Sequence, residues 1–187
     1  MLYSGRMHDA APGKSQRLFF AVWPGASARA AIASLASEVA RAAGGRATAA
    51  ERIHLTLAFL GEQPADRISA LHCLGGGIKA PAFVLTLDEV GCFRRTGITW
   101  LGASAPQSGL AALHAELGLV LQTEGFAVDE RPYAPHLTLA RRSKTSIRRR
   151  LPEAVVWPVD AFALVASDLG TGGPTYRTMA EWRLGAG

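Results

Sequence analysis

Two copies of one pentapeptide carry the residues of this sequence that could do chemistry. His-Leu-Thr-Leu-Ala occurs at 54–58 and again at 136–140, nearly half the chain apart. Because successive side chains of a strand point to opposite faces, each copy places its histidine and threonine on one face and its leucines on the other. An imidazole titrates near neutral pH, so one histidine can accept a proton while the other donates one. Threonine hydroxyls can donate hydrogen bonds to oxygens on which negative charge builds.

These groups fit an in-line displacement at phosphorus. His54 and His136 would transfer the protons, and Thr56 and Thr138 would hold the phosphate. A single His-x-Thr strand would indicate only a half-exposed strand with a polar face, since such alternation is common. Two identical copies in equivalent settings predict a paired site. Because the two motifs are locally identical, their chemistry does not rank one histidine as the acid and the other as the base.

A metal site is the competing interpretation of the two histidines. Two histidines are fewer than the ligand set expected for zinc, and the displacement needs no nucleophilic serine or cysteine. We therefore predict that no metal or other cofactor takes part. The other histidines, His8, His72 and His114, lie outside the repeated strands and are interpreted as surface or packing residues.

Hydrophobic periodicity predicts the elements that must position these side chains. The order strand, helix, motif strand, helix occurs twice. It predicts an α+β fold of two pseudo-symmetric lobes, each an antiparallel sheet backed by helices, with the active-site cleft between them. Strands are expected at 17–23, 53–60, 83–90, 98–101, 136–140, 161–167 and 175–184, the last two joined by a glycine-rich turn; helices are expected at 27–43, at 65–74 with glycines 75–77 breaking it, from 110 until Gly125, and as a short segment capped by Ser143.

The chain is expected to divide into a flexible leader, residues 1–16, and a single bilobal domain, residues 17–187. Within the motif strands, strict alternation puts Phe59 with the leucines of the first copy. It puts Arg141 with the leucines of the second copy, away from His136. Arg141 reaches the site only if its strand ends or twists at Ala140.

Charge and cysteine content indicate the kind of partner and the cellular compartment in which such a site would work. The 187 residues carry a formal net charge of +5. Six of the basic residues form a cluster within positions 141–150. This basic cluster suits an anionic partner such as RNA, or is a solvated helix face without a partner. Cys73 and Cys92 form no CxxC pair, which is typical of inert thiols in a reducing compartment. No apolar run approaches the roughly 20 residues of a membrane helix, so we expect a cytoplasmic protein that does not enter the membrane. We also expect it to be a monomer. The basic cluster consists of Arg141, Arg142, Lys144, Arg148, Arg149 and Arg150.

With these motifs the chain resembles the 2H phosphoesterase superfamily, and within it the RNA 2′,3′-cyclic phosphodiesterases, formerly called 2′-5′ RNA ligases. The resemblance covers residues 17–184 and includes RLFFAVWP, HLTLAFLGE, RPYAPHLTLAR and the closing GPTY and WRL segments. It implies a bilobal α+β fold and metal-independent hydrolysis of a 2′,3′-cyclic phosphate at an RNA end to a 2′-phosphomonoester. It also implies that His54 is the proton donor to the departing 3′ oxygen, that His136 is the proton acceptor that activates water, and that Thr56 and Thr138 bind the phosphate.

Three further residues are candidate substrate contacts. Arg141 would suit bidentate contacts to a phosphate, and Tyr133 and Trp23 could stack on a base or pack in the core. Other activities stay open: hydrolysis of a small cyclic nucleotide such as an ADP-ribose cyclic phosphate, ligation of 2′-5′ RNA ends, or a non-catalytic module that binds RNA ends. The expected partners are accordingly RNA ends or small cyclic nucleotides.

Overall fold

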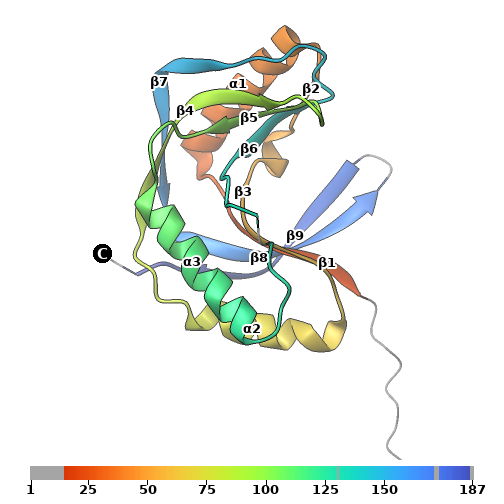
Figure 1. Ribbon diagram of the computed structural model, residues 1–187, viewed down its shortest axis with the longest axis vertical. Coiled ribbons are helices and arrows are strands. Elements are labelled where there is room, and N and C mark those ends of the chain that lie inside the picture. The colour runs from red at the N-terminus through yellow and green to blue at the C-terminus, as the bar shows by residue number, and fades with distance from the viewer. Residues whose placement is uncertain (1–14, 130, 171–172, 186–187) are drawn as a thin grey trace, which may run out of the picture.

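The computed structural model describes residues 15–129, 131–170 and 173–185 (Figure 1). Most of the expected leader lies outside the described residues, and Gln16 already belongs to the first strand. The elements in chain order are β1 (Gln16–Val22), α1 (Ala26–Ala43), β2 (Arg46–Ala47), the 3-10 turn η1 (Ala50–Arg52), β3 (Leu55–Gln63), η2 (Ala65–Arg67), α2 (Ile68–Gly77), β4 (Phe83–Phe93), β5 (Ile98–Gly102), α3 (Ser108–Thr123), β6 (Leu137–Arg141), β7 (Arg149–Val159), β8 (Ala161–Gly170) and β9 (Gly173–Arg183).

Two antiparallel sheets form the two lobes, as expected. One sheet has the strand order β3-β1-β8-β9, and the other has the order β2-β6-β5-β4-β7. Helix α1 packs against the five-stranded sheet, while α2 and α3 pack against the four-stranded sheet (Figure 1). The two motif strands, β3 and β6, therefore lie in different lobes.

The chain crosses between the two lobes repeatedly. After β1, helix α1 crosses to the sheet that contains β6, and β3 then returns to pair with β1. A single continuous core of apolar side chains runs through both lobes, including Leu55 and Leu57 from β3 and Leu137 and Leu139 from β6. The leucines of both motifs are thus buried, which fixes the opposite faces as the polar ones.

Two expectations about local structure are wrong. Glycines 75–77 do not break α2 but form its last turn. A Cβ on Gly75 would lie 2.5 Å from the ring of Trp182, so the glycine permits a close approach of helix to sheet. No helix follows Ser143. Its hydroxyl is 2.8 Å from that of Thr99 instead of capping a helix, and the chain continues into β7, an edge strand whose prolines hide its periodicity.

Strand β3 contains a β-bulge inside its motif. Thr56 and Ala58 pair with the consecutive residues Ala21 and Phe20 of β1, so the intervening Leu57 is the extra residue. A bulge shifts the alternation by one residue beyond this point.

Strand β6 contains the same bulge at the equivalent position. Thr138 and Ala140 pair with the consecutive residues Trp100 and Thr99 of β5, which leaves Leu139 as the extra residue. The residue after each alanine, Phe59 in β3 and Arg141 in β6, consequently turns from the leucine face to the cleft. The strict alternation expected for these two residues is therefore wrong.

Candidate active site

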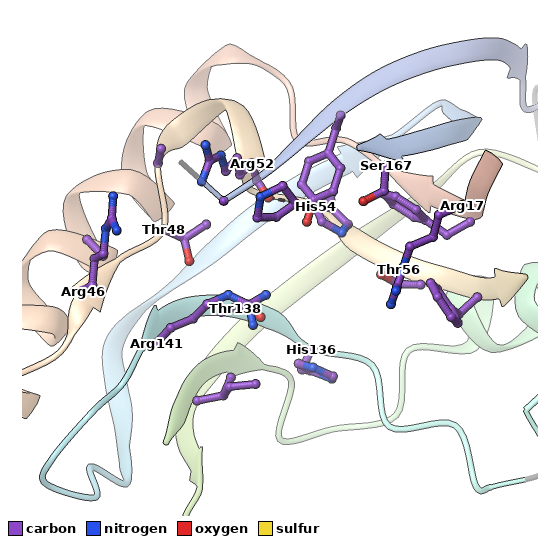
Figure 2. Close-up of a pocket in the computed structure, with 18 of the residues that line it drawn as sticks. Arg17, Arg46, Thr48, Arg52, His54, Thr56, His136, Thr138, Arg141 and Ser167 are labelled. Atoms are coloured by element: carbon purple, nitrogen blue, oxygen red, sulfur yellow. Dashed lines mark hydrogen bonds between the residues drawn. The ribbon is translucent and has the colours of Figure 1, made fainter. Parts of the chain in front are cut away.

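A cavity of about 770 Å³ lies between the two lobes, and both motifs open into it. His54 and Thr56 line it from the β3 side, and His136 and Thr138 line it from the β6 side (Figure 2). The repeat thus brings its four polar side chains to one pocket, as predicted from alternation before each bulge.

The two imidazoles are held in the same way. The Nδ1 atom of His54 is 2.8 Å from the carbonyl oxygen of Arg52, and that of His136 is 2.8 Å from the carbonyl oxygen of Ala134. Because a carbonyl oxygen can only accept, Nδ1 carries the hydrogen in both rings. Nε2 is then the nitrogen that can exchange a proton with a ligand in the pocket.

The surroundings of the two rings differ. Three aromatic rings enclose His54, with centroids 5.0 Å away for Phe19, 5.2 Å for Trp23 and 4.9 Å for Tyr176. His136 instead meets the edge of one ring, that of Phe93, at 5.0 Å. The motifs are identical, so this asymmetry comes from the neighbouring strands.

The enclosure affects the proton affinity of His54. Burial lowers the pKa of His54 below its ordinary value of 6.5. The hydrogen bond to the Arg52 carbonyl raises the pKa, and the positive charges of Arg141 and His136 lower it. A bound anion would offset the effect of these charges, so a phosphate in the pocket would raise the pKa of His54 relative to the empty pocket.

Comparisons with known proteins identify the family of this chain. Residues 23–171 match the 2′-5′ RNA ligase superfamily. This chain belongs to the 2′-5′ RNA ligase superfamily. It is 37% identical over 171 residues to a protein of Escherichia coli named RNA 2′,3′-cyclic phosphodiesterase, covering 90% of this chain and 97% of that protein. It is 32% identical to a protein of the same name from Thermus thermophilus, covering 90% of each.

Solved structures give the same result. A crystal structure of E. coli LigT complexed with 3′-AMP superposes with a TM-score of 0.83 at 35% identity, over 91% of this chain and 99% of that one. The apo form of E. coli LigT superposes with a TM-score of 0.84 at 35% identity. This chain therefore shares its bilobal fold with E. coli LigT along nearly its full length.

Of the two interpretations left open for Tyr133, base stacking and packing, the structure shows packing within the protein. The Tyr133 ring stacks on His114 with centroids 3.7 Å apart, and its hydroxyl donates a hydrogen bond of 3.0 Å to the carbonyl oxygen of Thr56. The Nδ1 of His114 is 2.9 Å from the carbonyl oxygen of Leu57, the bulge residue. Tyr133 is absent from the described residues that line the pocket. Its contact with the site is through the backbone of β3, at the carbonyl of Thr56.

The other two candidate contacts, Trp23 and Arg141, lie closer to the histidines of the pocket. The ring of Trp23 packs beside His54 but does not line the cavity in the described part of the chain. Arg141 lines the pocket beside Thr138 because of the bulge at Leu139 (Figure 2). Of the three candidate contacts, the structure therefore brings Arg141 to the histidine pair.

Most of the other residues that line the pocket were not predicted from the sequence. Arg17 and Phe19 project from β1 into the pocket, and alternation along that strand could have placed both on the face next to the motif. Tyr176 could have been noted from the GPTY segment, whereas β2, with only two residues, offers no periodicity. The lining residues that the analysis did not single out as site residues are Arg17, Phe19, Arg46, Ala47, Thr48, Ala49, Arg52, Phe59, Ile98, Arg142, Ser167, Gly170, Gly173, Pro174 and Tyr176.

The described residues contain no group of three or more His, Cys, Asp or Glu side chains arranged to hold a metal ion. No helix among them has the length and apolar character required to cross a membrane.

Proposed function

We propose that this protein hydrolyses the 2′,3′-cyclic phosphate at the end of an RNA to a 2′-phosphomonoester. The observation that carries this proposal is the paired presentation of His54, Thr56, His136 and Thr138 from two identical strands in one pocket. The names of its relatives, RNA 2′,3′-cyclic phosphodiesterase, support the same activity. So does the nucleotide 3′-AMP in the related E. coli structure.

In the proposed reaction each of these side chains has a separate role. His136 accepts a proton from water through Nε2, and the water oxygen attacks phosphorus. The bond between phosphorus and the 3′ oxygen breaks, and His54 donates its Nε2 proton to that oxygen. The hydroxyls of Thr56 and Thr138 and the guanidinium of Arg141 bind the non-bridging oxygens as their charge grows. His136 then releases its proton to solvent and His54 takes one up from solvent, which restores both rings for the next turnover; no metal takes part.

The assignment of donor and acceptor follows the order of the two motifs in the family. The lowered pKa of His54 does not by itself rank the two histidines, because a bound phosphate would raise that pKa again. A substrate with sulfur in place of the 3′ oxygen separates the two roles, because a thiolate leaves without a proton. It should restore turnover to His54→Ala and leave His136→Ala inactive; the reverse pattern would exchange the roles.

The activity itself is tested with an RNA oligomer that ends in a 2′,3′-cyclic phosphate, incubated in excess EDTA. Formation of a 2′-phosphate end is the expected result. An ADP-ribose cyclic phosphate and a pair of RNA ends suitable for 2′-5′ ligation serve as competing substrates, compared by kcat/KM. Binding of RNA ends without turnover of any cyclic phosphate would contradict the proposal and indicate a binding module.

We further propose that the enzyme works as a cytoplasmic monomer. Both motifs and all lining residues that carry the chemistry come from one chain, so the site needs no second subunit. Sedimentation of the active enzyme at assay concentration tests this, and a dimer as the active species would contradict it.

A further inference from the structure

The pocket holds more positive charge than one cyclic phosphate requires. Five arginines line it, and its described lining residues include no Asp or Glu. The cavity of about 770 Å³ lies in the upper part of the range of small-molecule sites, roughly 300–1,000 Å³. In Figure 2, Arg46 and Arg141 lie to one side of the histidines, and Arg17 lies to the other. The arginines are Arg17, Arg46, Arg52, Arg141 and Arg142.

Two of these arginines face each other across a strand pair. In the register of β2 and β6, Arg46 is directly opposite Arg141. Like charges at opposite positions of adjacent strands destabilise the pair unless an anion lies between them. No carboxylate pairs with either arginine among the residues that the structure describes. This arrangement is unfavourable in the empty pocket and favourable with a bound anion.

The next residue, Arg142, has a strained backbone. Its φ of 56° makes it the non-glycine residue with positive φ in the described chain. In a regular strand Arg142 would point away from Arg141, but the left-handed conformation brings both arginines to the pocket. Strain of this kind persists when neighbouring contacts enforce it, and it concentrates at functional sites.

The contacts that enforce this conformation surround Ser143. Its backbone N–H donates to the carbonyl oxygen of Gly97 at 2.9 Å, and its hydroxyl is 2.8 Å from that of Thr99. The N–H of Lys144 donates to the carbonyl oxygen of Ala43 at 2.8 Å. The bend is thus tied both to the hairpin of β4 and β5 and to the end of α1, so Arg142 is positioned before any ligand binds.

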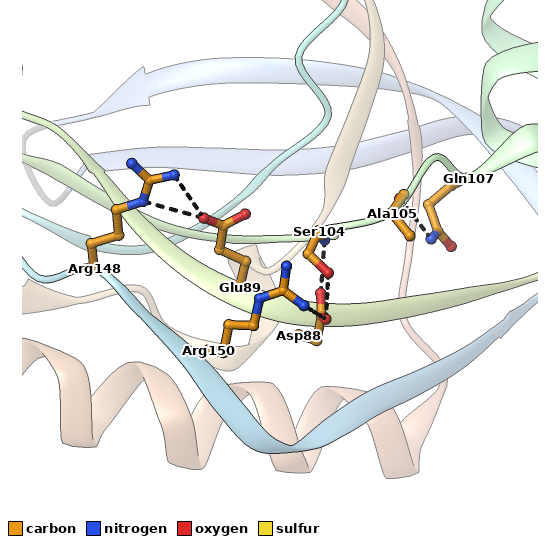
Figure 3. Close-up of polar contacts among 7 residues, drawn as sticks. All are labelled: Asp88, Glu89, Ser104, Ala105, Gln107, Arg148 and Arg150. Carbon is orange, nitrogen blue, oxygen red and sulfur yellow. Dashed lines mark hydrogen bonds and ion pairs between the residues drawn. The ribbon is translucent and has the colours of Figure 1, made fainter.

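The other arginines of the basic cluster behave differently. Arg148 pairs with Glu89 at 3.2 Å and Arg150 with Asp88 at 3.6 Å (Figure 3), and Arg149 pairs with Glu38. Their charges are compensated by carboxylates outside the pocket. The cluster therefore divides into two groups. Arg148, Arg149 and Arg150, at the start of β7 and just before it, are compensated by carboxylates. Among the described residues, Arg141 and Arg142 form no such ion pair.

We infer that Arg46 and Arg142 form a binding site for a second phosphate group, and that this group is the phosphodiester that precedes the terminal nucleotide of the RNA. The inference rests on the proposed function, because it takes the cyclic phosphate to lie between the histidines with Arg141 beside it. A guanidinium binds a phosphate through charge-assisted, often bidentate hydrogen bonds. The enzyme then recognises an oligonucleotide end in preference to a lone cyclic nucleotide.

The test compares kcat/KM for three substrates: adenosine 2′,3′-cyclic phosphate, its 5′-phosphorylated form, and the dinucleotide ApA with a 2′,3′-cyclic phosphate. Wild type should prefer both substrates with a second phosphate by about tenfold or more, the gain expected for one good charge-assisted contact. Arg46→Ser and Arg142→Gly should each reduce this ratio several-fold. Glycine suits the left-handed conformation at 142, so that variant removes the guanidinium while keeping the bend.

Arg150→Ser is the matched control, since it removes an arginine from the same cluster outside the pocket, and it should keep the wild-type ratio. A ratio near one in wild type, or a preference that survives Arg46→Ser and Arg142→Gly, would overturn the inference. A preference for ApA that the 5′-phosphorylated nucleotide lacks would assign the gain to the second nucleoside and also overturn it.

A binding measurement separates failure of this site from failure of the proposed function. Calorimetry with adenosine 2′-phosphate and adenosine 2′,5′-bisphosphate needs no turnover. Tighter binding of the bisphosphate, reduced in both variants, supports the second site. Equal binding of the two ligands overturns the second site alone, whereas no binding of either, together with no turnover, overturns both proposals.

Discussion

Removal of the Tyr133 hydroxyl tests how the two motifs are held together. In Tyr133→Phe the ring can remain stacked on His114, and the lost group is the hydroxyl that donates to the carbonyl oxygen of Thr56 at 3.0 Å. Burial raises the pKa of Tyr133, so the hydroxyl stays protonated and remains a donor throughout the working pH range. The bond ties the segment that leads into β6 to the strand that carries Thr56.

The size of the effect follows from the single bond. A neutral hydrogen bond contributes about 0.5–1.5 kcal/mol to the free energy of unfolding, and up to about 3 kcal/mol if the abandoned carbonyl cannot reach water. In a protein of this size about 1 kcal/mol lowers the Tm by roughly 2–4 °C. We expect kcat for the cyclic phosphate to fall as well, but less than tenfold, because Thr56 is displaced and not removed.

Urea unfolding and steady-state kinetics measure both effects, and a double-mutant cycle with His114→Ala is the control. His114 bonds the neighbouring carbonyl of Leu57 and stacks on Tyr133, so the two substitutions should couple by about 0.5 kcal/mol or more. Unchanged stability in Tyr133→Phe would refute the claim that the hydrogen bond from Tyr133 to the Thr56 carbonyl stabilises the fold. A large loss of activity without loss of stability would instead make Tyr133 a substrate contact.

Three other substitutions test separate features. The lowered pKa of His54 means that the unfolded chain binds its proton more readily, so stability should fall as pH drops below about 6.5. His54→Gln should show a shallower fall in urea titrations, and an equal slope would contradict this. Gly91→Ala would place a Cβ 2.1 Å from the ring of Trp100, which packs on Phe93 beside His136. A cost of about 1–3 kcal/mol in urea unfolding and a lower kcat are expected, and an unchanged midpoint would count against the packing. Arg142→Gly relieves a positive φ and should hold or raise the Tm in thermal melts, whereas a clear drop would mean that the side chain stabilises the bend.

The sequence predicted the parts of the fold and site that depend on repetition and periodicity. The repeated pentapeptide located His54, Thr56, His136 and Thr138, because buried leucines at alternate positions fix which face is polar. The two-sheet, bilobal architecture also followed from the repeated order of elements. These features are local patterns that a single sequence displays.

Features set by pairing between strands could not be read in this way. The bulges at Leu57 and Leu139 leave no mark on the alternation, yet they decide that Phe59 and Arg141 face the cleft. Strand β7 was missed because its prolines interrupt the pattern and its arginines resemble a solvated helix face. The aromatic enclosure of one histidine arises from strands distant in sequence, so identical motifs could not reveal it.

The measurement that tests the central claim most directly is the pH dependence of cyclic phosphate hydrolysis by wild type, His54→Ala and His136→Ala in excess EDTA. Wild-type kcat/KM should follow a bell-shaped curve whose limbs belong to the coupled histidine pair. Each variant should lose about 10²–10⁴-fold in rate and one limb of the curve. A flat wild-type profile between about pH 5 and 9, or near wild-type turnover by either folded variant, would contradict two-histidine acid–base catalysis.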